Sequence, residues 1–354
     1  MIPLASDTET RPDAAMRAAI AAAEVGDEQR GEDPTVNRLL ERCAALLGKP
    51  AALFLPSGTM CNLVAIKLHT MPGDVVLAEG SSHVLRAEAG GAGLVAGTMT
   101  EPITGSPDVP PGTFTVADLE RAVERITILP SPHGPPARLL CIEQTHNLGG
   151  GTVWPYETLA AVAGRARERG LAVHMDGARL MNAALASGVA AARWGALVDT
   201  VWLDFTKGLG APIGAVLAGS EADIARARRL KHAFGGAMRQ AGIAAAGCLY
   251  ALDENIARLA DDHANARRLA TGLARIRGLR LSHGPPQTNI VFFEPGPDGP
   301  TAAQLVASCR QRGLGLGAVG TRVRAVTHLD VSVEDIDRAL AIIAAAMAER
   351  RDRP

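Results

Sequence analysis

The sequence lacks three features that would each define a class of protein. Its five cysteines are scattered and form no Cys-x-x-Cys pair, which argues against a zinc site and a disulfide framework. It begins with neither the basic nor the apolar segment of a signal peptide, and no apolar run is long enough to span a bilayer. The net charge is only −1, so nothing favours binding to nucleic acid or anionic membranes. We therefore expect a cytoplasmic protein with reduced cysteines and no metal.

What the sequence does have is enough apolar material for a large core. It contains 354 residues, of which 47% are hydrophobic, and this length predicts two domains. Apolar runs typical of buried strands alternate with helical stretches between residues 51 and 219, which favours an α/β fold with a parallel sheet. The predicted strands are residues 51–55, 75–78, 139–143, 171–176, 198–205 and 215–218.

The remaining third of the chain predicts a smaller α+β domain. Residues 221–276 are helical in composition, a Gly/Pro-rich break follows at 284–286, and an apolar strand begins near Thr288. A helix over residues 333–350 closes the chain. We predict a large domain over residues 1–250, which includes an N-terminal segment that contacts substrate, and a small C-terminal domain over residues 251–354.

Lys207 and Asp176 are the strongest functional candidates. Lys207 follows an apolar run, and burial there would lower the pKa of its amine and allow it to attack a carbonyl group. Asp176 ends another apolar run 31 residues earlier, a distance that suits a strand, a crossover helix over residues 179–194 and a second parallel strand. Either residue alone is more commonly a surface lysine or a helix-capping aspartate.

Together, the two residues indicate pyridoxal phosphate. Ligands of open α/β sheets bind beyond the carboxyl ends of the strands, where both side chains would meet. Lys207 would bind the aldehyde carbon of the cofactor, and Asp176 would keep its pyridine nitrogen protonated.

Two glycine-containing turns are candidate phosphate sites. Ser57, Gly58 and Thr59 lie between a predicted strand and a helix, where free N–H groups suit an anion, although an ordinary helix cap would look the same. The pattern GLGAVG at 315–320 fits a dinucleotide-binding motif but lacks a following helix, so it is set aside.

His83, which follows a predicted strand, is placed to lie on the cofactor ring. His133, His146, His174 and His328 each have an equally ordinary interpretation as hydrogen-bonded structural residues.

In sum, the chain resembles the threonine aldolase family, which are enzymes of PLP fold type I related to β-eliminating lyases. The resemblance runs nearly end to end and rests on the motifs SDT at 6–8 with RP at 11–12, GEDPTVN at 31–37, PSGTM at 56–60, EAGG at 88–91, THN at 145–147, HMDGAR at 174–179, TKGLGAP at 206–212, MRQ at 238–240, DHAN at 262–265 and VTHL at 326–329. It implies an aspartate aminotransferase-like fold with a mostly parallel seven-stranded sheet.

The resemblance also implies roles for individual residues. Lys207 would carry pyridoxal 5'-phosphate, with Asp176 at the ring nitrogen, Arg179 near its hydroxyl and the substrate, and His83 stacked on the ring. The phosphate would lie against Gly58, Thr59 and Thr206, and Arg239 would reach it from a neighbouring subunit. Ser6 and Arg324 would hold the substrate carboxylate, and His133 would approach the β-hydroxyl group. The family's active sites lie at a dimer interface in a homotetramer, so we expect an oligomer.

Several positions depart from the family's pattern and leave the substrate range open. Arg30 stands where a tyrosine is usual, Ala87 where an aromatic residue is common, and His232 where a lysine often occurs; Gln144 replaces Asn, and residues 204–206 read Asp-Phe-Thr instead of a Cys-Leu-Ser-like sequence. Neutral drift would explain them. Alternatively, Arg30 would favour a β-hydroxy amino acid with an anionic side chain.

The expected activity is retro-aldol cleavage of L-threonine, L-allo-threonine or a related β-hydroxy-α-amino acid to glycine and an aldehyde, with His83 or His133 as the base, with or without a bound water. One alternative is a β-eliminating lyase, which would release ammonia and a keto acid. The other is a non-catalytic protein with the same fold, which the intact set Lys207, Asp176, Arg179 and His83 argues against.

Overall fold

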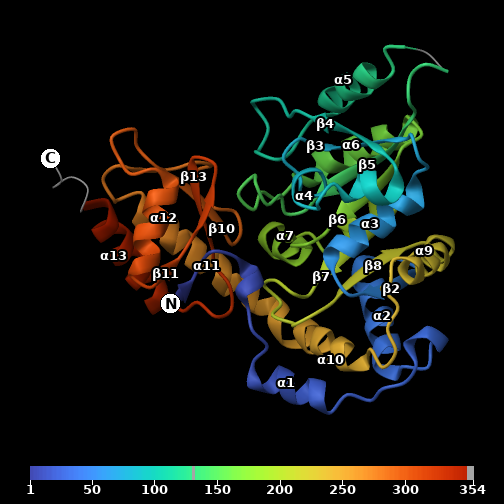
Figure 1. Ribbon diagram of the computed structural model, residues 1–354, viewed down its shortest axis with the longest axis horizontal. Coiled ribbons are helices and arrows are strands. Elements are labelled where there is room, and N and C mark those ends of the chain that lie inside the picture. Colours follow the sequence, from blue (N-terminus) through green and yellow to red (C-terminus); the bar gives the residue numbers. More distant parts are fainter. Residues whose placement is uncertain (130–131, 349–354) are drawn as a thin grey trace.

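The chain forms two bodies, each built around its own sheet (Figure 1). The computed structural model describes residues 1–129 and 132–348. The larger body contains a seven-stranded sheet and the smaller one a four-stranded sheet. None of the helices within the described residues is long and apolar enough to cross a membrane.

The large sheet has the order β2-β8-β7-β6-β5-β3-β4. Neighbours from β7 through β6, β5 and β3 to β4 are parallel, whereas β8 runs antiparallel to both β2 and β7. The strands are β2 (Ala51–Leu55), β3 (Val75–Glu79), β4 (Met99–Ile103), β5 (Ala137–Glu143), β6 (Ala172–Asp176), β7 (Thr200–Asp204) and β8 (Ala215–Gly219). The mostly parallel seven-stranded sheet predicted from the sequence is thus confirmed.

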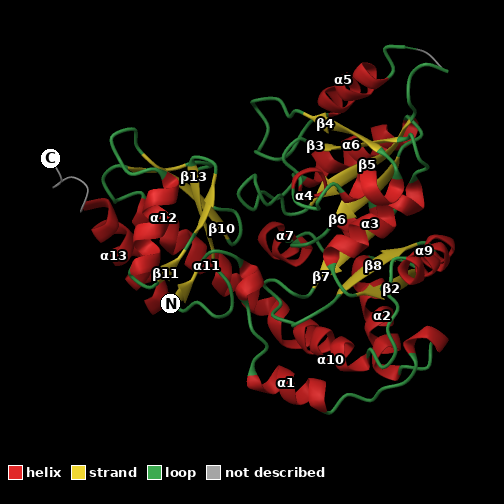
Figure 2. Ribbon diagram, viewed as in Figure 1, coloured by secondary structure: helices red, strands yellow, loops and turns green. Residues whose placement is uncertain are grey.

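Helices cover both faces of this sheet (Figure 2). The helices of the larger body are α1 (Ala14–Ala21), α2 (Pro34–Leu47), α3 (Gly58–His69), α4 (His83–Arg86), α5 (Val116–Ile126), α6 (Tyr156–Glu168), α7 (Leu180–Ser187), α8 (Ala191–Ala196), α9 (Glu221–Ala233) and α10 (Gly242–Tyr250). The crossover predicted as one helix over 179–194 is two helices, α7 and α8, because Gly188 takes a left-handed conformation with φ 71° and ends α7.

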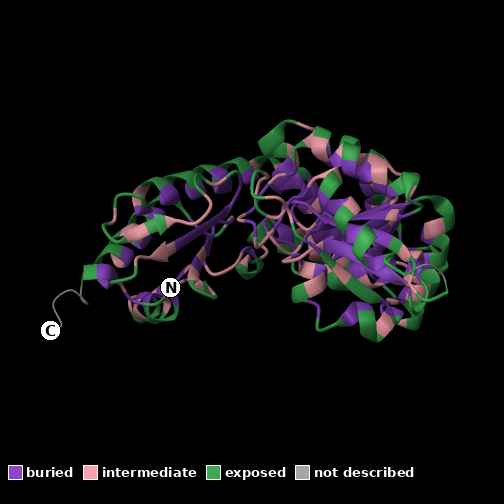
Figure 3. Cartoon of the chain, turned by 90° about the horizontal axis from the view of Figure 1, so that it is seen from above, coloured by how far each residue is buried: buried purple, intermediate pink, exposed green. Residues whose placement is uncertain are grey.

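Alternation along the strands divides the core of this body into two layers. Phe54, Val201 and Val216 belong to one buried cluster, whereas the adjacent Leu53, Trp202 and Leu217 belong to another on the opposite face. Successive strand side chains point to opposite faces, so strands with apolar residues at successive positions are buried on both sides of the sheet. Figure 3 shows this continuous buried interior.

The smaller body combines an antiparallel sheet with three helices. Its sheet has the order β12-β13-β10-β9, from β9 (Leu279–Leu281), β10 (Ile290–Pro295), β12 (Gly317–Val319) and β13 (Arg322–Val326). The helices are α11 (Ile256–Leu273), α12 (Ala302–Gln311) and α13 (Val333–Ala348). Residues 349 and 350, which the sequence assigned to the last helix, lie outside the described residues.

The first residues of the chain pack on the smaller body. Strand β1 (Ile2–Pro3) pairs in parallel with β11 (Leu314–Gly315), and Leu4 is buried in the core of that body. The GLGAVG segment forms β11 and β12 with no helix after it. The domain boundary at residue 250 stays a prediction; Ile2 and Leu4 belong to the core of the smaller body, and Met16 to that of the larger one.

Candidate active site

A cleft of about 440 Å³ opens at the carboxyl ends of the central strands. Glu143, Asp176 and Asp204 are the last residues of β5, β6 and β7, so parallel neighbours direct three carboxylates toward it. The residues that line the cleft are Ser6, Thr8, Ser57, Gly58, Thr59, His83, Ala87, Glu88, Glu143, Asn147, Asp176, Ala178, Arg179, Trp202, Asp204, Thr206, Lys207 and Arg324. Lys207 and Asp176 therefore share one cleft, as their spacing predicted.

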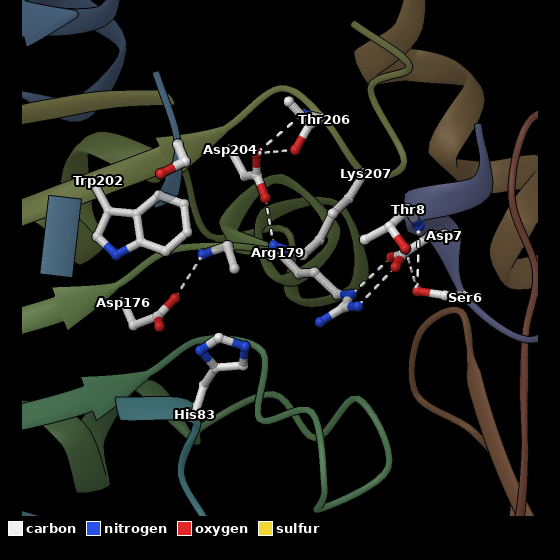
Figure 4. Close-up of polar contacts among 12 residues, drawn as sticks. Ser6, Asp7, Thr8, His83, Asp176, Arg179, Trp202, Asp204, Thr206 and Lys207 are labelled. Carbon is white, nitrogen blue, oxygen red and sulfur yellow. Dashed lines mark hydrogen bonds and ion pairs between the residues drawn. The ribbon is translucent and has the colours of Figure 1, made fainter. Parts of the chain in front are cut away.

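Lys207 lies in the loop after β7, where its Nζ forms an ion pair with the Asp204 carboxylate (Figure 4). The Asp204 side chain is buried, and its Oδ1 accepts hydrogen bonds from Thr206 N at 3.0 Å and Thr206 Oγ1 at 2.9 Å. The sequence predicted apolar surroundings for the amine. That prediction is wrong, because the amine faces a buried carboxylate, and desolvation alone does not describe its environment.

Asp176 is buried and held in place by two donors. Its Oδ2 accepts a hydrogen bond from Asn62 Nδ2 at 2.9 Å and its Oδ1 one from Ala178 N at 3.1 Å. Burial, with the nearby carboxylates Glu143 and Glu88, raises the pKa of Asp176 above its ordinary value of 3.8. A carboxyl group in such surroundings favours a cationic neighbour, which fits a protonated pyridine nitrogen.

His83 begins α4 and stands at the side of the cleft, with a side chain that is 35% exposed. Its Nδ1 lies 2.8 Å from Glu88 Oε1, and its backbone N–H donates to Glu143 Oε2 at 2.6 Å. The hydrogen bond to Glu88 raises the pKa of His83 above 6.5; burial opposes this shift, and the charges of Asp176 and Glu143 support it.

The N-terminus of α3 forms a cradle for an anion. Ser57 caps this helix of 12 residues, and the following N–H groups of Gly58 and Thr59 border the cleft. A Cβ atom on Gly58 would lie 2.1 Å from Cη2 of Trp202, so only glycine lets the backbone pass this close to the indole ring. Free N–H groups and the helix dipole suit a phosphate there.

Arg179 and Arg324 occupy the side of the cleft near the N-terminal segment. Arg179 Nε and Nη2 each donate to the Asp7 carboxylate at 2.7 Å. Arg324 donates from Nη1 to Asn147 Oδ1 at 3.0 Å and from Nη2 to the Ala5 carbonyl at 3.1 Å, while its buried Nε has no hydrogen-bond partner within the described residues. Ser6 Oγ accepts hydrogen bonds from Thr8. Arg324 is therefore better placed than Arg179 to receive an anion.

Three predicted site residues lie outside the cleft of their own chain. His133 is exposed in the turn that precedes β5, at the end of that strand opposite Glu143. Arg30 and Arg239 have side chains 72% and 64% exposed and lie 3.9 and 3.1 Å from the carboxylate of Asp27. Within one chain the structure does not bring His133 or Arg30 to the cleft. Their substrate contacts, and the role of Arg30 in selecting anionic side chains, require a second subunit and stay predictions. The role of Arg239 involves a second subunit and stays a prediction.

Several residues of the site are not among those predicted from the sequence. Glu143 ends a predicted strand just as Asp176 does, so the same argument could have identified it. Asn62 and Glu88 carried no such signal, because their places follow from how α3 packs against the sheet. Asp204 was noted only as a departure from a family pattern.

Comparisons with known proteins show which family the chain belongs to. The sequence pattern of the β-eliminating lyase family matches residues 3–295. The chain belongs to this family. Its relatives include the low-specificity L-threonine aldolase 1 of Arabidopsis thaliana, 36% identical over 98% of this chain and 96% of that protein. The low specificity L-threonine aldolase of Escherichia coli (strain K12) is 40% identical over 95% of this chain and 96% of its own length.

Solved structures give the same fold. A threonine aldolase of Leishmania major superposes with a TM-score of 0.81 at 23% identity and covers 98% of this chain and 100% of its own. Serine palmitoyltransferase of Sphingomonas wittichii gives a TM-score of 0.73 at 18% identity, over 99% of this chain and 88% of that one. The predicted family resemblance and fold type are confirmed.

Proposed function

We propose that this protein is a pyridoxal phosphate-dependent aldolase that cleaves L-threonine, L-allo-threonine or a related β-hydroxy-α-amino acid to glycine and an aldehyde. The observation that carries the proposal is the meeting of Lys207 and Asp176, from neighbouring parallel strands, in one cleft beside an anion cradle. The names of the relatives supply the substrate class.

The cleft residues fit the cofactor. Gly58 and Thr59, with Thr206 beyond them, would hold its phosphate, Asp176 its ring nitrogen and Lys207 its aldehyde carbon. His83 would lie on the ring and Arg179 near the ring hydroxyl. When bound, pyridoxal phosphate accepts the electrons left on Cα when a bond to that carbon breaks.

The other residues act on the substrate. Arg324, with a buried Nε that has no partner in the described chain, would bind the carboxylate together with Ser6. His83 would take the β-hydroxyl proton, the Cα–Cβ bond would break, an aldehyde would leave, and a proton returned to Cα would complete glycine. We expect His83→Asn to lower kcat by about 10² or more. His133→Asn is the matched change outside the cleft of its own chain; an unchanged kcat would exclude His133 as the base, and a similar loss would place it in the site of a neighbouring subunit.

Incubation of the cofactor-loaded protein with L-threonine, L-allo-threonine, phenylserine and 3-hydroxyaspartate tests the function. We expect glycine and an aldehyde in equal amounts from the wild type and neither product from Lys207→Ala. Ammonia and a keto acid instead would identify a β-eliminating lyase, the second candidate that the family description favours. A protein that binds the cofactor and gives neither pair of products would contradict both activities.

We further propose a homotetramer with active sites at a dimer interface. It is supported by an exposed apolar groove formed by Ile20, Pro212, Ile213, Ile243 and neighbouring residues close to Arg239. Light scattering of the purified protein tests it, and a monomer at assay concentration would refute it.

A cytoplasmic location is also proposed, supported by five buried cysteines without disulfides; cell fractionation tests it.

A further inference from the structure

Asn62 lies at the centre of a buried hydrogen-bond network that joins two sides of the cleft. Its Nδ2 donates to Glu88 Oε1 at 2.6 Å and to Asp176 Oδ2 at 2.9 Å. Its Oδ1 accepts from Trp202 Nε1 at 2.7 Å and lies 3.1 Å from His174 Nε2. Asn62 is fully buried, and all four of its hydrogen-bonding positions are used.

The orientation of the Asn62 amide follows from its neighbours. An indole N–H only donates, so the atom that faces Trp202 has to be the carbonyl oxygen. His174 is consistent with this, because burial lowers its pKa to about 3 and keeps the ring neutral; its Nδ1 lies 2.8 Å from Thr200 Oγ1, and its Nε2 is then free to donate to Asn62. The amide NH₂ group is therefore turned toward the two carboxylates.

Glu88 is held by this amide and in turn holds His83. Its side chain is 2% exposed, and its Oε1 lies within hydrogen-bonding distance of both Asn62 Nδ2 and His83 Nδ1. A carboxylate only accepts, so Nδ1 of His83 carries a proton. Nε2 has no hydrogen-bond partner within the described residues and is the ring nitrogen left for a ligand in the cleft.

We propose that Glu88, fixed by Asn62, is a positioning residue that holds His83 with Nδ1 protonated and Nε2 available to the substrate. A base whose second nitrogen is bound to a buried carboxylate is oriented and fixed in one tautomer. The part of this inference that concerns turnover rests on the proposed aldolase function, whereas the ring's tautomer and titration do not.

The titration of His83 in the cofactor-free protein tests the inference directly. Nitrogen-15 NMR distinguishes the two tautomers, and the signal of His83 among nine histidines is the one lost in His83→Asn. In Glu88→Gln we expect His83 to titrate at lower pH and the Nδ1–H tautomer to lose its preference, because the charge on Glu88 is gone. The other acidic groups that act on His83, Asp176 and Glu143, are unchanged in this variant.

Two further variants separate positioning from packing. Glu88→Asp keeps the charge and is expected to restore part of the titration shift. Glu79→Gln is the matched control, because Glu79 lies 3.0 Å from Nε2 of His146; it should move the titration of His146 and leave that of His83 in place. Thermal unfolding identifies any variant that fails to fold.

The pH profile of kcat/KM for threonine cleavage is the second measurement. We expect Glu88→Gln to lower the plateau at least tenfold and to move the acid limb to lower pH. An unchanged tautomer and titration of His83 in Glu88→Gln would overturn the inference, whatever the activity. If the wild type makes no glycine, the proposed function fails, and the NMR titration still decides the role of Glu88.

Discussion

At the scale of single residues, Asp262 on α11 is a buried carboxyl group with incomplete pairing. Its Oδ1 accepts a hydrogen bond from Arg258 at 2.6 Å, but its buried Oδ2 has no partner among the described residues. Burial raises the pKa of Asp262 to about 7; Arg258 opposes this shift, and the charge of Asp7 adds to it. The group is therefore protonated in the folded protein at pH values at which the unfolded chain has already released the proton.

This difference makes stability depend on pH. Between 3.8 and about 7 the folded state holds the extra proton, so the free energy of unfolding falls as the pH rises through this window. Asp262→Asn removes the dependence while keeping an acceptor for Arg258. We expect the variant to gain on the order of 2 kcal/mol relative to wild type between pH 5 and pH 8, measured by denaturant unfolding.

The control is Asp253→Asn, which removes the same charge from a half-exposed partner of Arg42. Its effect relative to wild type should be the same at both pH values. An Asp262→Asn variant that also behaves identically at pH 5 and pH 8 would show that Asp262 ionises normally in the folded protein.

At the scale of elements, the turn from β2 into α3 depends on Gly58. Gly58→Ala would place a Cβ 2.1 Å from the buried indole ring of Trp202, so the ring or the start of α3 has to move. Overpacking of this kind costs about 1–3 kcal/mol or more. We expect a lower unfolding midpoint and, because the anion cradle shifts, at least tenfold weaker binding of pyridoxal phosphate.

Gly164→Ala is the matched change on α6, where a Cβ would meet nothing within 4 Å. It should leave cofactor affinity unchanged and raise stability by about 0.5–1 kcal/mol, since alanine is the better helix former. Equal cofactor affinity in the two variants, measured by fluorescence titration, would argue against a phosphate at the start of α3.

The same elements show what a sequence reveals about this fold. The buried strands were predicted closely because most of their residues are apolar at successive positions; β2 was predicted with its observed bounds, Ala51–Leu55. Strand β4 was missed because its first residues, Met99, Thr100 and Glu101, are exposed or half-buried and form no apolar run. The edge position alone does not hide a strand, since β2 lies at the opposite edge of the same sheet and is apolar throughout.

The residues of the candidate site also fall into those that the sequence predicts and those that it does not. Lys207 and Asp176 were predicted together because the carboxyl ends of parallel strands converge, a rule that needs only spacing. The contact between Asn62 and Glu88 depends on how two segments pack, and the pairing of Lys207 with Asp204 depends on the path of a loop. Neither contact can be predicted from a periodic pattern in the sequence. His133 was assigned by resemblance alone and lies outside the cleft of its own chain.

At the scale of the whole molecule, Asp7 joins the N-terminal segment to both bodies. It accepts two hydrogen bonds from Arg179, which follows β6 in the larger body, and one of 3.1 Å from Asn289, just before β10 in the smaller body. Burial alone would raise the pKa of Asp7, but the charge and hydrogen bonds of Arg179, aided by Lys207 and Asn289, outweigh it and hold the pKa well below 3.8.

Asp7→Ala leaves the buried guanidinium of Arg179 without its partner, so we expect the free energy of unfolding to fall by about 3–5 kcal/mol. The effect depends on pH with a definite sign. Because the folded pKa is depressed, the wild-type pair contributes fully above 3.8 and loses its contribution as the pH falls through the folded value. The difference between wild type and Asp7→Ala should therefore be constant at neutral pH and shrink in acid.

Asp337→Ala gives a control with the same geometry in a different environment. Asp337 also accepts two hydrogen bonds of 2.7 Å from one arginine, Arg268, but both side chains are about half exposed, and exposed pairs contribute little because water screens them. Chemical unfolding of both variants from pH 7 to pH 3 compares the two pairs directly. If Asp7→Ala lowers the free energy of unfolding no more than Asp337→Ala does at pH 7, the Asp7 carboxylate does not hold the N-terminal segment and the two bodies together.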